Sequence, residues 1–198
     1  GAITLGGNTT IDTNATSAAG DITIGAVTGG RTLTLSTGNN ISGADVTGTS
    51  VSGANTLTLS DIGGTASFSQ GIASGTLTVG NTVANVSLTG SGGAIGNAIN
   101  FANDGTLTIG DASSDTFTFQ GGFTTTSVGG TVTLSGSFSS VSDPITIGAV
   151  TLGSNVDIDT NATDGNGDIT IGAVTGGSNT LKLQTGDNIT NANLTVSG

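Results

Sequence analysis

The chain lacks most of the residues that carry enzyme chemistry. Its 198 residues include no Cys, His, Trp, Tyr or Met, and Pro occurs once. Without Cys there is no disulfide framework, no thiol chemistry and no Cys-based metal site. Without His and Cys, neither a Ser-His-Asp nor a Cys-His arrangement can be built. We therefore predict no catalytic residue, no enzyme activity and no cofactor other than the calcium ion considered below.

Charge is scarce and almost all of one sign. Only 8% of the residues are charged, Lys and Arg total 2, and the 13 acids, all Asp, leave a net charge of −11. Nucleic-acid binding depends on basic side chains that neutralise phosphates, so nucleic acid is excluded as a partner. No apolar run approaches the ~18 residues of a membrane-spanning helix, and we expect no membrane insertion.

What the chain does contain is a short alternation of apolar and polar residues. Apolar residues recur at i and i+2, usually with Thr between them, which places the apolar pair on one face of a strand. Strong helix formers are rare and no segment has a sustained helical period. We predict an all-β chain without helices. The pairs are Ile22/Ile24, Leu33/Leu35, Leu57/Leu59, Leu77/Val79, Leu107/Ile109, Phe117/Phe119, Val132/Leu134, Ile145/Ile147, Ile169/Ile171 and Leu181/Leu183.

The chain also repeats itself over a long distance. Residues 11–30 read IDTNATSAAGDITIGAVTGG, and residues 158–177 read IDTNATDGNGDITIGAVTGG. The offset is 147 residues and becomes 148 after one inserted residue near Ser178. The organisation is therefore a long repeat unit, 1–147, followed by a partial second copy, 148–198. This is typical of a window cut from a longer tandem array.

The strand spacing predicts a β-solenoid. Strands recur about every 10–13 residues, and two spacings make a coil of roughly 20–24 residues, a length typical of solenoid repeats. A narrow solenoid core needs only Ala, Val, Ile and Leu, whereas the competing string of β-sandwiches needs larger aromatic cores. We predict one solenoid segment over residues 1–198, with about eight to ten coils stacked at ~4.8 Å.

The repeated segment also predicts which side chains point inward. The inward set is Ile22, Ile24, Leu33, Leu35, Ile169, Ile171, Leu181 and Leu183, and the outward set is Thr23, Thr34, Thr170 and Lys182. Lys182 tests this register, because burial of an unpaired ammonium is very costly. The six Phe residues all lie outside the repeated segment, and we interpret them as packing that widens the central core. They are Phe68, Phe101, Phe117, Phe119, Phe123 and Phe138.

Two phrases carry a resemblance to a known family. G-D-I-T-I-G occurs at Gly20–Gly25 and Gly167–Gly172, and T-L-x-L-x-T-G-x-N-I occurs at Thr32–Ile41 and Thr180–Ile189. This phrasing resembles the repeats of filamentous haemagglutinin-like bacterial adhesins, which are two-partner-secreted surface proteins. The resemblance implies a right-handed parallel β-helix at the bacterial cell surface. It implies a structural segment of an extracellular fibre or adhesin stalk that attaches to a surface or matrix. The implied partners are glycans or proteins of host or neighbouring cells.

One segment has the spacing of a calcium loop. Asp164, Asn166 and Asp168 stand in a D-x-N-x-D pattern that turns alternate oxygens toward a cation. Two features depart from a calcium loop: the sixth position is Ile169, where Gly is expected, and no bidentate Glu follows. The alternative is a solvated Asp/Asn/Gly corner.

Three weaker signals have structural alternatives. Asp157 and Asp159 would project from one strand face like the paired carboxylates of a glycan-active enzyme, but the first copy has Thr10 and Asp12 there. The glycine-rich stretch 90–96 loosely resembles a phosphate-binding loop, but we interpret it as a coil corner because no helix is expected to follow it. The glycosylation sequons are interpreted as internal Asn ladders or turn caps, and they begin at Asn8, Asn14, Asn85, Asn161, Asn188 and Asn193.

An ice-binding face is the principal alternative function. Thr-x-Thr motifs could form a flat Thr array, although outward Thr is ordinary in strands and the spacing between the motifs is irregular. The motifs are at 32/34, 56/58, 76/78, 106/108, 116/118 and 131/133.

The last expectation concerns assembly. Solenoid ends expose strand edges, and proteins usually cover such edges with caps. Gly1–Leu5 and Leu194–Gly198 both read as repeat phrases without capping sequence. We therefore expect either self-association end to end into a filament or covalent continuation within a longer chain.

Overall fold

A computed structural model describes residues 1–16, 20–38, 41–186 and 191–198. These residues contain strands, turns and corners, and no helix. The strands are β1 (Ile3–Thr4), β2 (Thr9–Asp12), β3 (Ile22–Thr28), β4 (Thr32–Ser36), β5 (Val46–Leu59), β6 (Thr65–Phe68), β7 (Ile72–Val79), β8 (Asn85–Leu88), β9 (Gly93–Ile95), β10 (Ile99–Asn100), β11 (Leu107–Ile109), β12 (Thr116–Phe119), β13 (Phe123–Thr124), β14 (Val132–Ser139), β15 (Ile145–Ile147), β16 (Val150–Asp159), β17 (Ile169–Ile171), β18 (Val174–Thr175), β19 (Leu181–Gln184) and β20 (Leu194–Val196).

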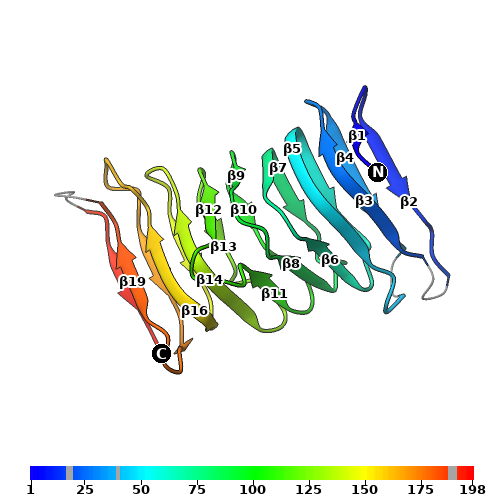
Figure 1. The fold of residues 1–198 in the computed structure, drawn as a ribbon. Helices are drawn as coiled ribbons and strands as arrows, with labels where there is room; N and C mark the ends of the chain where they lie inside the picture. The colour runs from blue at the N-terminus through cyan, green and yellow to red at the C-terminus, as the bar shows by residue number, and fades with distance from the viewer. Residues whose placement is uncertain (17–19, 39–40, 187–190) are drawn as a thin grey trace.

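The strands stack as a parallel β-solenoid of about eight turns, which confirms the predicted fold class and the lower end of the predicted coil number. Figure 1 shows the coils in one row, from β1 and β2 at one end to β19 at the other. Each coil has three faces, which we number in chain order. Face 1 carries the β1 position, face 2 the β2 position, and face 3 the position of Ile22 at the start of β3. The long strand β5 bends around all three faces.

Because β5 and other long strands turn the corners, the faces do not separate into three sheets. One 15-stranded sheet combines faces 1 and 3 with the first rungs of face 2, and a 5-stranded sheet, β10-β13-β15-β17-β20, continues face 2. Coil length varies more than predicted. Leu107 pairs with Val132, 25 residues later, and Val132 pairs with Val150, only 18 residues later. The ladder register shifts where β5 and β14 turn corners, between Ser52 and Ala54 and between Leu134 and Gly136, and the straight parts of the faces stay paired.

The predicted inward residues are buried in the first copy and at the start of the second, which confirms the register there. The last coil is different, because Leu181 and Leu183 are only partly buried against the core. Of the predicted outward residues, Thr23 is exposed, while Thr34 and Thr170 are half-buried between the Thr side chains of neighbouring coils. The Lys182 side chain is 60% exposed, so the register of its strand is not inverted.

The Phe residues pack in the core, as predicted. Five of them form one cluster, in which the Phe117 and Phe138 rings stack at 5.4 Å and Phe119 lies 4.7 Å from Phe123. Phe68 lies apart from this cluster and fills the space beside Gly48, where an added Cβ would lie 2.4 Å from its ring. The core is therefore a column of aliphatic rungs, with the aromatic rungs concentrated in the middle coils.

The two copies of the repeat keep the same coil-on-coil register. Ile3 pairs with Val27 in the first copy, and the equivalent Val150 pairs with Val174 in the second. Thr9 pairs with Leu33, and the equivalent Val156 pairs with Leu181. The same holds for Ile22 with Val46 and Ile169 with Leu194.

The two copies nevertheless occupy different faces. The face 3 ladder that begins at Ile22 runs through Val46, Ala66 and Val86 to Leu107 and then to Val150. Val150 is the sequence equivalent of Ile3, which lies on face 1. The long repeat is therefore not a whole number of coils, and the second copy is rotated by one face about the solenoid axis.

Candidate functional site

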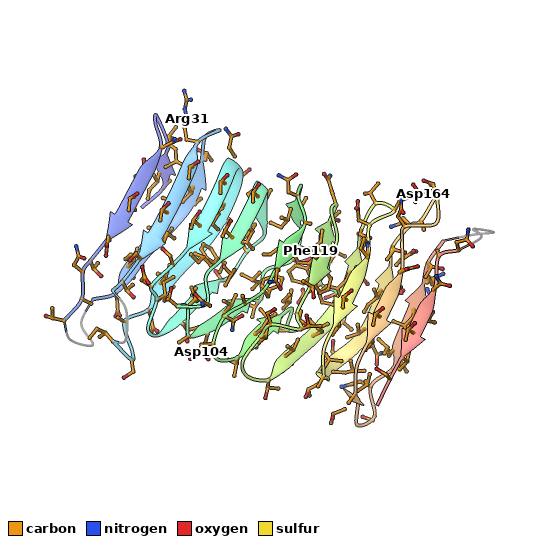
Figure 2. The ribbon with its side chains drawn as sticks, turned by 180° about the vertical axis from the view of Figure 1, so that it is seen from behind. Arg31, Asp104, Phe119 and Asp164 are labelled. Atoms are coloured by element: carbon orange, nitrogen blue, oxygen red, sulfur yellow. The ribbon has the colours of Figure 1, made fainter. Side chains whose placement is uncertain are left out.

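The three predicted calcium ligands lie in the corner between β16 and β17, and Figure 2 shows Asp164 on the opposite rim of the molecule from Asp104. The Asp164 carboxylate accepts a hydrogen bond from the backbone N–H of Asn166 at 3.0 Å. The Asp168 carboxylate accepts the backbone N–H of Asn193, one coil later, at 2.6 Å. Both carboxylates therefore have hydrogen-bonding roles within the solenoid.

These contacts bear on whether the segment suits a cation. Calcium sites gather several oxygen ligands around one point. Within the described residues, no three acidic side chains converge in this way. The oxygen atoms around Asp164 fit a hydrogen-bonded corner better than a set of ligands around one cation. Calcium binding therefore stays a prediction.

The carboxylate pair weighed for glycan chemistry also has partners. Asp157 accepts a hydrogen bond from the Lys182 ammonium at 3.1 Å, across one coil. Asp159 accepts the backbone N–H of Asn161 at 2.8 Å, and Asn161 has a left-handed φ of 46°. The first copy repeats this turn, because Asp12 accepts the N–H of Asn14 at 2.8 Å. Asp159 thus caps a turn that recurs in both copies.

The glycine-rich stretch 90–96 forms the predicted corner only at residues 90–92, because Gly93–Ile95 is strand β9. Gly90 lies directly against the backbone of Gln70 in the preceding coil, and an added Cβ there would lie 2.0 Å from the Gln70 Cα. The glycines therefore permit close contact between coils, and no helix follows them to make a phosphate site.

A ladder of side-chain-to-backbone hydrogen bonds joins successive coils at the corners, and sequence analysis specified only part of it. An Asn or Asp immediately before the first inward position of a face accepts the backbone N–H of the residue at the same position one coil later. The side-chain oxygen thus accepts a backbone N–H that has no partner in the strand-to-strand hydrogen bonding at the corner. The bonds are Asn8 to Thr32 (3.1 Å), Asp21 to Asp45 (2.9 Å), Asp45 to Thr65 (2.7 Å), Asn85 to Thr106 (2.9 Å), Asn155 to Thr180 (3.0 Å) and Asp168 to Asn193 (2.6 Å).

This ladder accounts for most of the glycosylation sequons. Asn8 and Asn85 are acceptors in it, and Asn193 is a donor. Asn14 and Asn161 occupy left-handed turn positions, with φ of 44° and 46°. The predicted turn caps are confirmed for Asn14 and Asn161, whereas Asn8, Asn85 and Asn193 bond to Thr or Asp of a neighbouring coil rather than forming an internal Asn ladder. The sixth, Asn188, lies outside the described residues.

Two buried polar residues also hold corners, and sequence analysis did not single them out. The Asn103 amide donates to the carbonyls of Ala84, Gly105 and Thr106, at 3.3, 3.1 and 2.9 Å. The Asp115 carboxylate accepts the N–H groups of Asp111 and Ala112, both at 2.9 Å. Nothing in their local sequence distinguishes them from exposed Asn and Asp, because only the coil path decides which corner residue is enclosed.

The Thr-x-Thr motifs fall on different faces. Three of them form one array on face 2, where Thr32 pairs with Thr56 and Thr56 with Thr76, with a parallel row of Thr34, Thr58 and Thr78. The irregular sequence spacing is absorbed by the unequal coil lengths. The motifs at 106/108 and 131/133 pair with each other on face 3, and the motif at 116/118 lies on face 1 beside Ser137 and Ser139.

Two hollows formed by described residues bring no group of titratable side chains together. An apolar recess beside Gly93, between Ile72 and Phe117, has about 10 Å³ of free volume, which is space for about one water. A larger hollow of about 350 Å³ is lined by Gly96, Gln120, Gly121, Val141 and Asp143, with one titratable side chain. No helix among the described residues is long and apolar enough to cross a membrane.

The apolar surface gathers instead at the C-terminal coil. The exposed large hydrophobic side chains of the described chain are Val141, Val174, Leu194 and Val196, and three of these four belong to β18 and β20. Leu181 and Leu183 lie partly buried on β19 between these strands in sequence. These strands belong to the last coil of the described chain.

Comparison of the chain with protein-family models, with curated proteins and with solved structures finds no match in any of the three.

Proposed function

We propose that the chain is a structural segment of a bacterial extracellular fibre or adhesin stalk, a repetitive rod that displays or spaces surface-attachment, matrix or cell-contact regions. The observation that carries the proposal is the conserved register of the two copies. Val150, Val156 and Ile169 keep the coil-on-coil pairings of Ile3, Thr9 and Ile22. A repeat that preserves axial stacking in this way is suited to elongation.

Three further features support the proposal. The four candidate carboxylates, Asp157, Asp159, Asp164 and Asp168, are engaged in turn or inter-coil hydrogen bonds that hold the rod together. The G-D-I-T-I-G phrases resemble those of filamentous haemagglutinin-like adhesins. The net charge of −11 favours a soluble rod whose sides repel one another.

Immunogold labelling of cells that make the native protein tests this function. An antibody raised against the 198-residue chain should label the surface of intact cells, on thin projecting material. Permeabilised cells are the control for antigen held inside. Labelling confined to permeabilised cells would contradict an extracellular rod.

The Thr array of face 2 favours ice binding as a second candidate function. Two parallel rows of three Thr residues, Thr32-Thr56-Thr76 and Thr34-Thr58-Thr78, run along successive coils over the buried Leu33, Leu57 and Leu77. Rows spaced by the ~4.8 Å coil rise form a regular, rigid hydroxyl and methyl surface.

Thermal hysteresis separates the two candidates. If face 2 binds ice, the chain lowers the freezing point below the melting point, and Thr58→Lys at the centre of the array abolishes this gap. Thr133→Lys is the matched control, because Thr133 is also half-buried and stacks between Thr108 and Thr151 on face 3. Hysteresis equal to that of buffer, or loss in both variants alike, excludes the array as an ice-binding site.

A further inference from the structure

The single Pro of the chain follows an Asp at the corner between β14 and β15. Asp143 is half-buried and lines the hollow of about 350 Å³, and Pro144 is exposed. The Pro144 nitrogen carries no N–H and is more basic than an ordinary peptide nitrogen, so it is the better leaving group. The Asp143 carboxyl can reach the carbonyl carbon of its own residue by closing a five-membered ring. The Asp143–Pro144 bond therefore joins a built-in nucleophile to a good leaving group.

A buried hydroxyl donates a hydrogen bond to the carbonyl of this same peptide bond. Ser140 is completely buried, and its Oγ–H donates to the Asp143 carbonyl oxygen at 2.6 Å. A fixed donor on a carbonyl oxygen stabilises the negative charge that develops there when a nucleophile attacks the carbon. The folded chain thus holds the Asp143 carbonyl in a polarised state.

The same kind of hydroxyl bond fastens three other corners, where it is purely structural. In each corner a Thr hydroxyl donates to a backbone carbonyl that lies shortly before the next strand. None of the three accepting residues has a carboxyl side chain, and none precedes Pro. Of the four corners, only the one at Asp143 combines this donor with a bond that can break. The three structural bonds are Thr13 to Gly20 (2.7 Å), Thr37 to Ala44 (3.1 Å) and Thr160 to Gly167 (2.7 Å).

The backbone beside the bond is strained and is fixed on both sides. Ser142 has a left-handed φ of 60°, which is unfavourable for a residue with a Cβ atom. Its N–H donates to the Thr160 carbonyl at 2.9 Å, and its Oγ accepts the N–H of Thr163 at 2.8 Å. Beyond the bond, the Ile145 N–H donates to the Asp168 carbonyl at 2.9 Å. Because the next coil holds both sides, cleavage between them would release the strain at Ser142.

From these contacts we propose that the folded chain cleaves itself once, at the Asp143–Pro144 bond. A carboxyl oxygen of Asp143 bonds to the carbonyl carbon of the same residue, the C–N bond to Pro144 breaks, and the carboxyl proton passes to the Pro144 nitrogen. The products are a cyclic anhydride at residue 143 and a free secondary amine at residue 144. One water molecule then opens the anhydride to two carboxyl groups. Ser140 donates to the carbonyl oxygen during the attack and is not consumed.

The cleavage point lies close to the boundary of the long repeat. Pro144 stands shortly before Gly148, where the second copy begins. Strands on the two sides of the cut stay paired, β14 with β16 and β13 with β15. Cleavage therefore separates the two copies covalently and leaves the coils stacked, so the fragments part only when the chain unfolds. The inference does not depend on the rod function.

Mass spectrometry under denaturing conditions tests the inference on the 198-residue chain. The folded chain is incubated at pH ~4, where carboxyl groups begin to take up protons. It should yield residues 1–143 and 144–198, with masses that add up to the 18.8 kDa chain plus one water. No cut should follow the acids of the next coil, Asp159, Asp164 and Asp168, because none of them precedes Pro. The same chain unfolded in urea loses the Ser140 contact and should cleave about tenfold more slowly.

Variants separate the nucleophile from the donor. Asp143→Ala removes the carboxyl and should abolish cleavage, while Ser140→Ala should slow it by about tenfold. Thr13→Val removes the equivalent hydroxyl bond in a distant corner, and Asp111→Ala removes an exposed acid, so both should cleave like wild type. Circular dichroism establishes that each variant is folded. An intact wild-type chain, equal rates for the folded and unfolded chain, or an unchanged rate in Ser140→Ala overturns the inference.

Discussion

The first and last coils contain nearly the same residues, and they differ in what covers them. Leu33 is completely buried, while the equivalent Leu181 is only partly buried. The opposite holds at the other side of the repeat, where Ile158 is completely buried and the equivalent Ile11 is partly exposed. Each residue is buried when a coil lies on both sides of it. Among inward residues, full burial therefore depends on the position in the stack and not on the residue alone.

The comparison also shows that the length of the sequence repeat is not a whole number of coils. The same phrase, IDTNAT, forms the same turn at Asp12–Asn14 and Asp159–Asn161. The strands that lead into these turns nevertheless lie on different faces, face 2 for β2 and face 1 for β16. A tandem array built with this repeat would present each surface feature on successive faces around the rod.

The sharpest test of the comparison is a matched pair of core deletions. Leu33→Ala should lower the free energy of unfolding by about 2–5 kcal/mol, because it removes a fully enclosed side chain and leaves a cavity. Leu181→Ala should cost about 1 kcal/mol, because its site is already partly open to solvent. Denaturant unfolding followed by circular dichroism measures both. Equal losses would mean that the last coil is covered in solution.

In a second pair of variants, we expect the second-copy variant to be the more destabilised. Ile158→Ala should cost more than Ile11→Ala, by ~2 kcal/mol, because here the second-copy residue is enclosed and the first-copy residue lies in the end coil. The same unfolding measurement applies. If the first-copy variant were again the more destabilised, the cause would be a stronger first copy rather than the stack.

Buried hydrogen bonds should show a smaller contrast. Thr160 is completely buried and donates to the Gly167 carbonyl at 2.7 Å, and the equivalent Thr13 makes the same bond to Gly20 at 2.7 Å while exposed. Thr160→Val leaves a buried carbonyl without its donor and should cost ~1–2 kcal/mol, whereas Thr13→Val should cost ~0.5 kcal/mol. Thermal unfolding of the two variants should separate them, and a larger shift for Thr13→Val would contradict this account.

The ion pair between Lys182 and Asp157 in the second copy should contribute least to stability. The equivalents of Asp157 and Lys182 in the first copy are Thr10 and Thr34, which stack without charge. Lys182 and Asp157 are 60% and 38% exposed, and exposed pairs contribute ~0–1 kcal/mol. Lys182→Thr should therefore change stability by no more than ~0.5 kcal/mol, and added salt should reduce even this difference. A loss that persists at high salt would indicate a packing role for the Lys stem.

Calcium binding tests whether a sequence difference between the two copies has a functional effect. The D-x-N-x-D pattern at Asp164, Asn166 and Asp168 is absent from the first copy, where Ser17 and Ala19 stand at the first two ligand positions. If the predicted site exists, calorimetry should detect one bound calcium ion, and Asp164→Ala should remove it. Because Asp168 also accepts the N–H of Asn193, its substitution would confuse stability with binding. Absence of binding heat at millimolar calcium would leave only the hydrogen-bonded corner.

The inward and outward positions of the repeat could be predicted because strand alternation is a local property. Ile22, Ile24, Ile169 and Ile171 point inward as expected, and Lys182 is exposed. The roles of the corner residues could not be predicted in the same way. In sequence, Asn85 and Asp45 cannot be told apart from other turn residues, because their hydrogen-bond partners lie a whole coil away.

The sequence by itself determined the strand pattern, the Gly- and Asn-rich corners, the solenoid class and the existence of a repeat, because each follows from local alternation or self-similarity. Only the tertiary structure decided which face each segment occupies, which Thr motifs align and which copies of a residue are buried. The reason is that coil length varies: one coil runs from Leu107 to Val132, and the next, shorter coil runs from Val132 to Val150. The stacking partner of a residue therefore depends on the length of every corner before it.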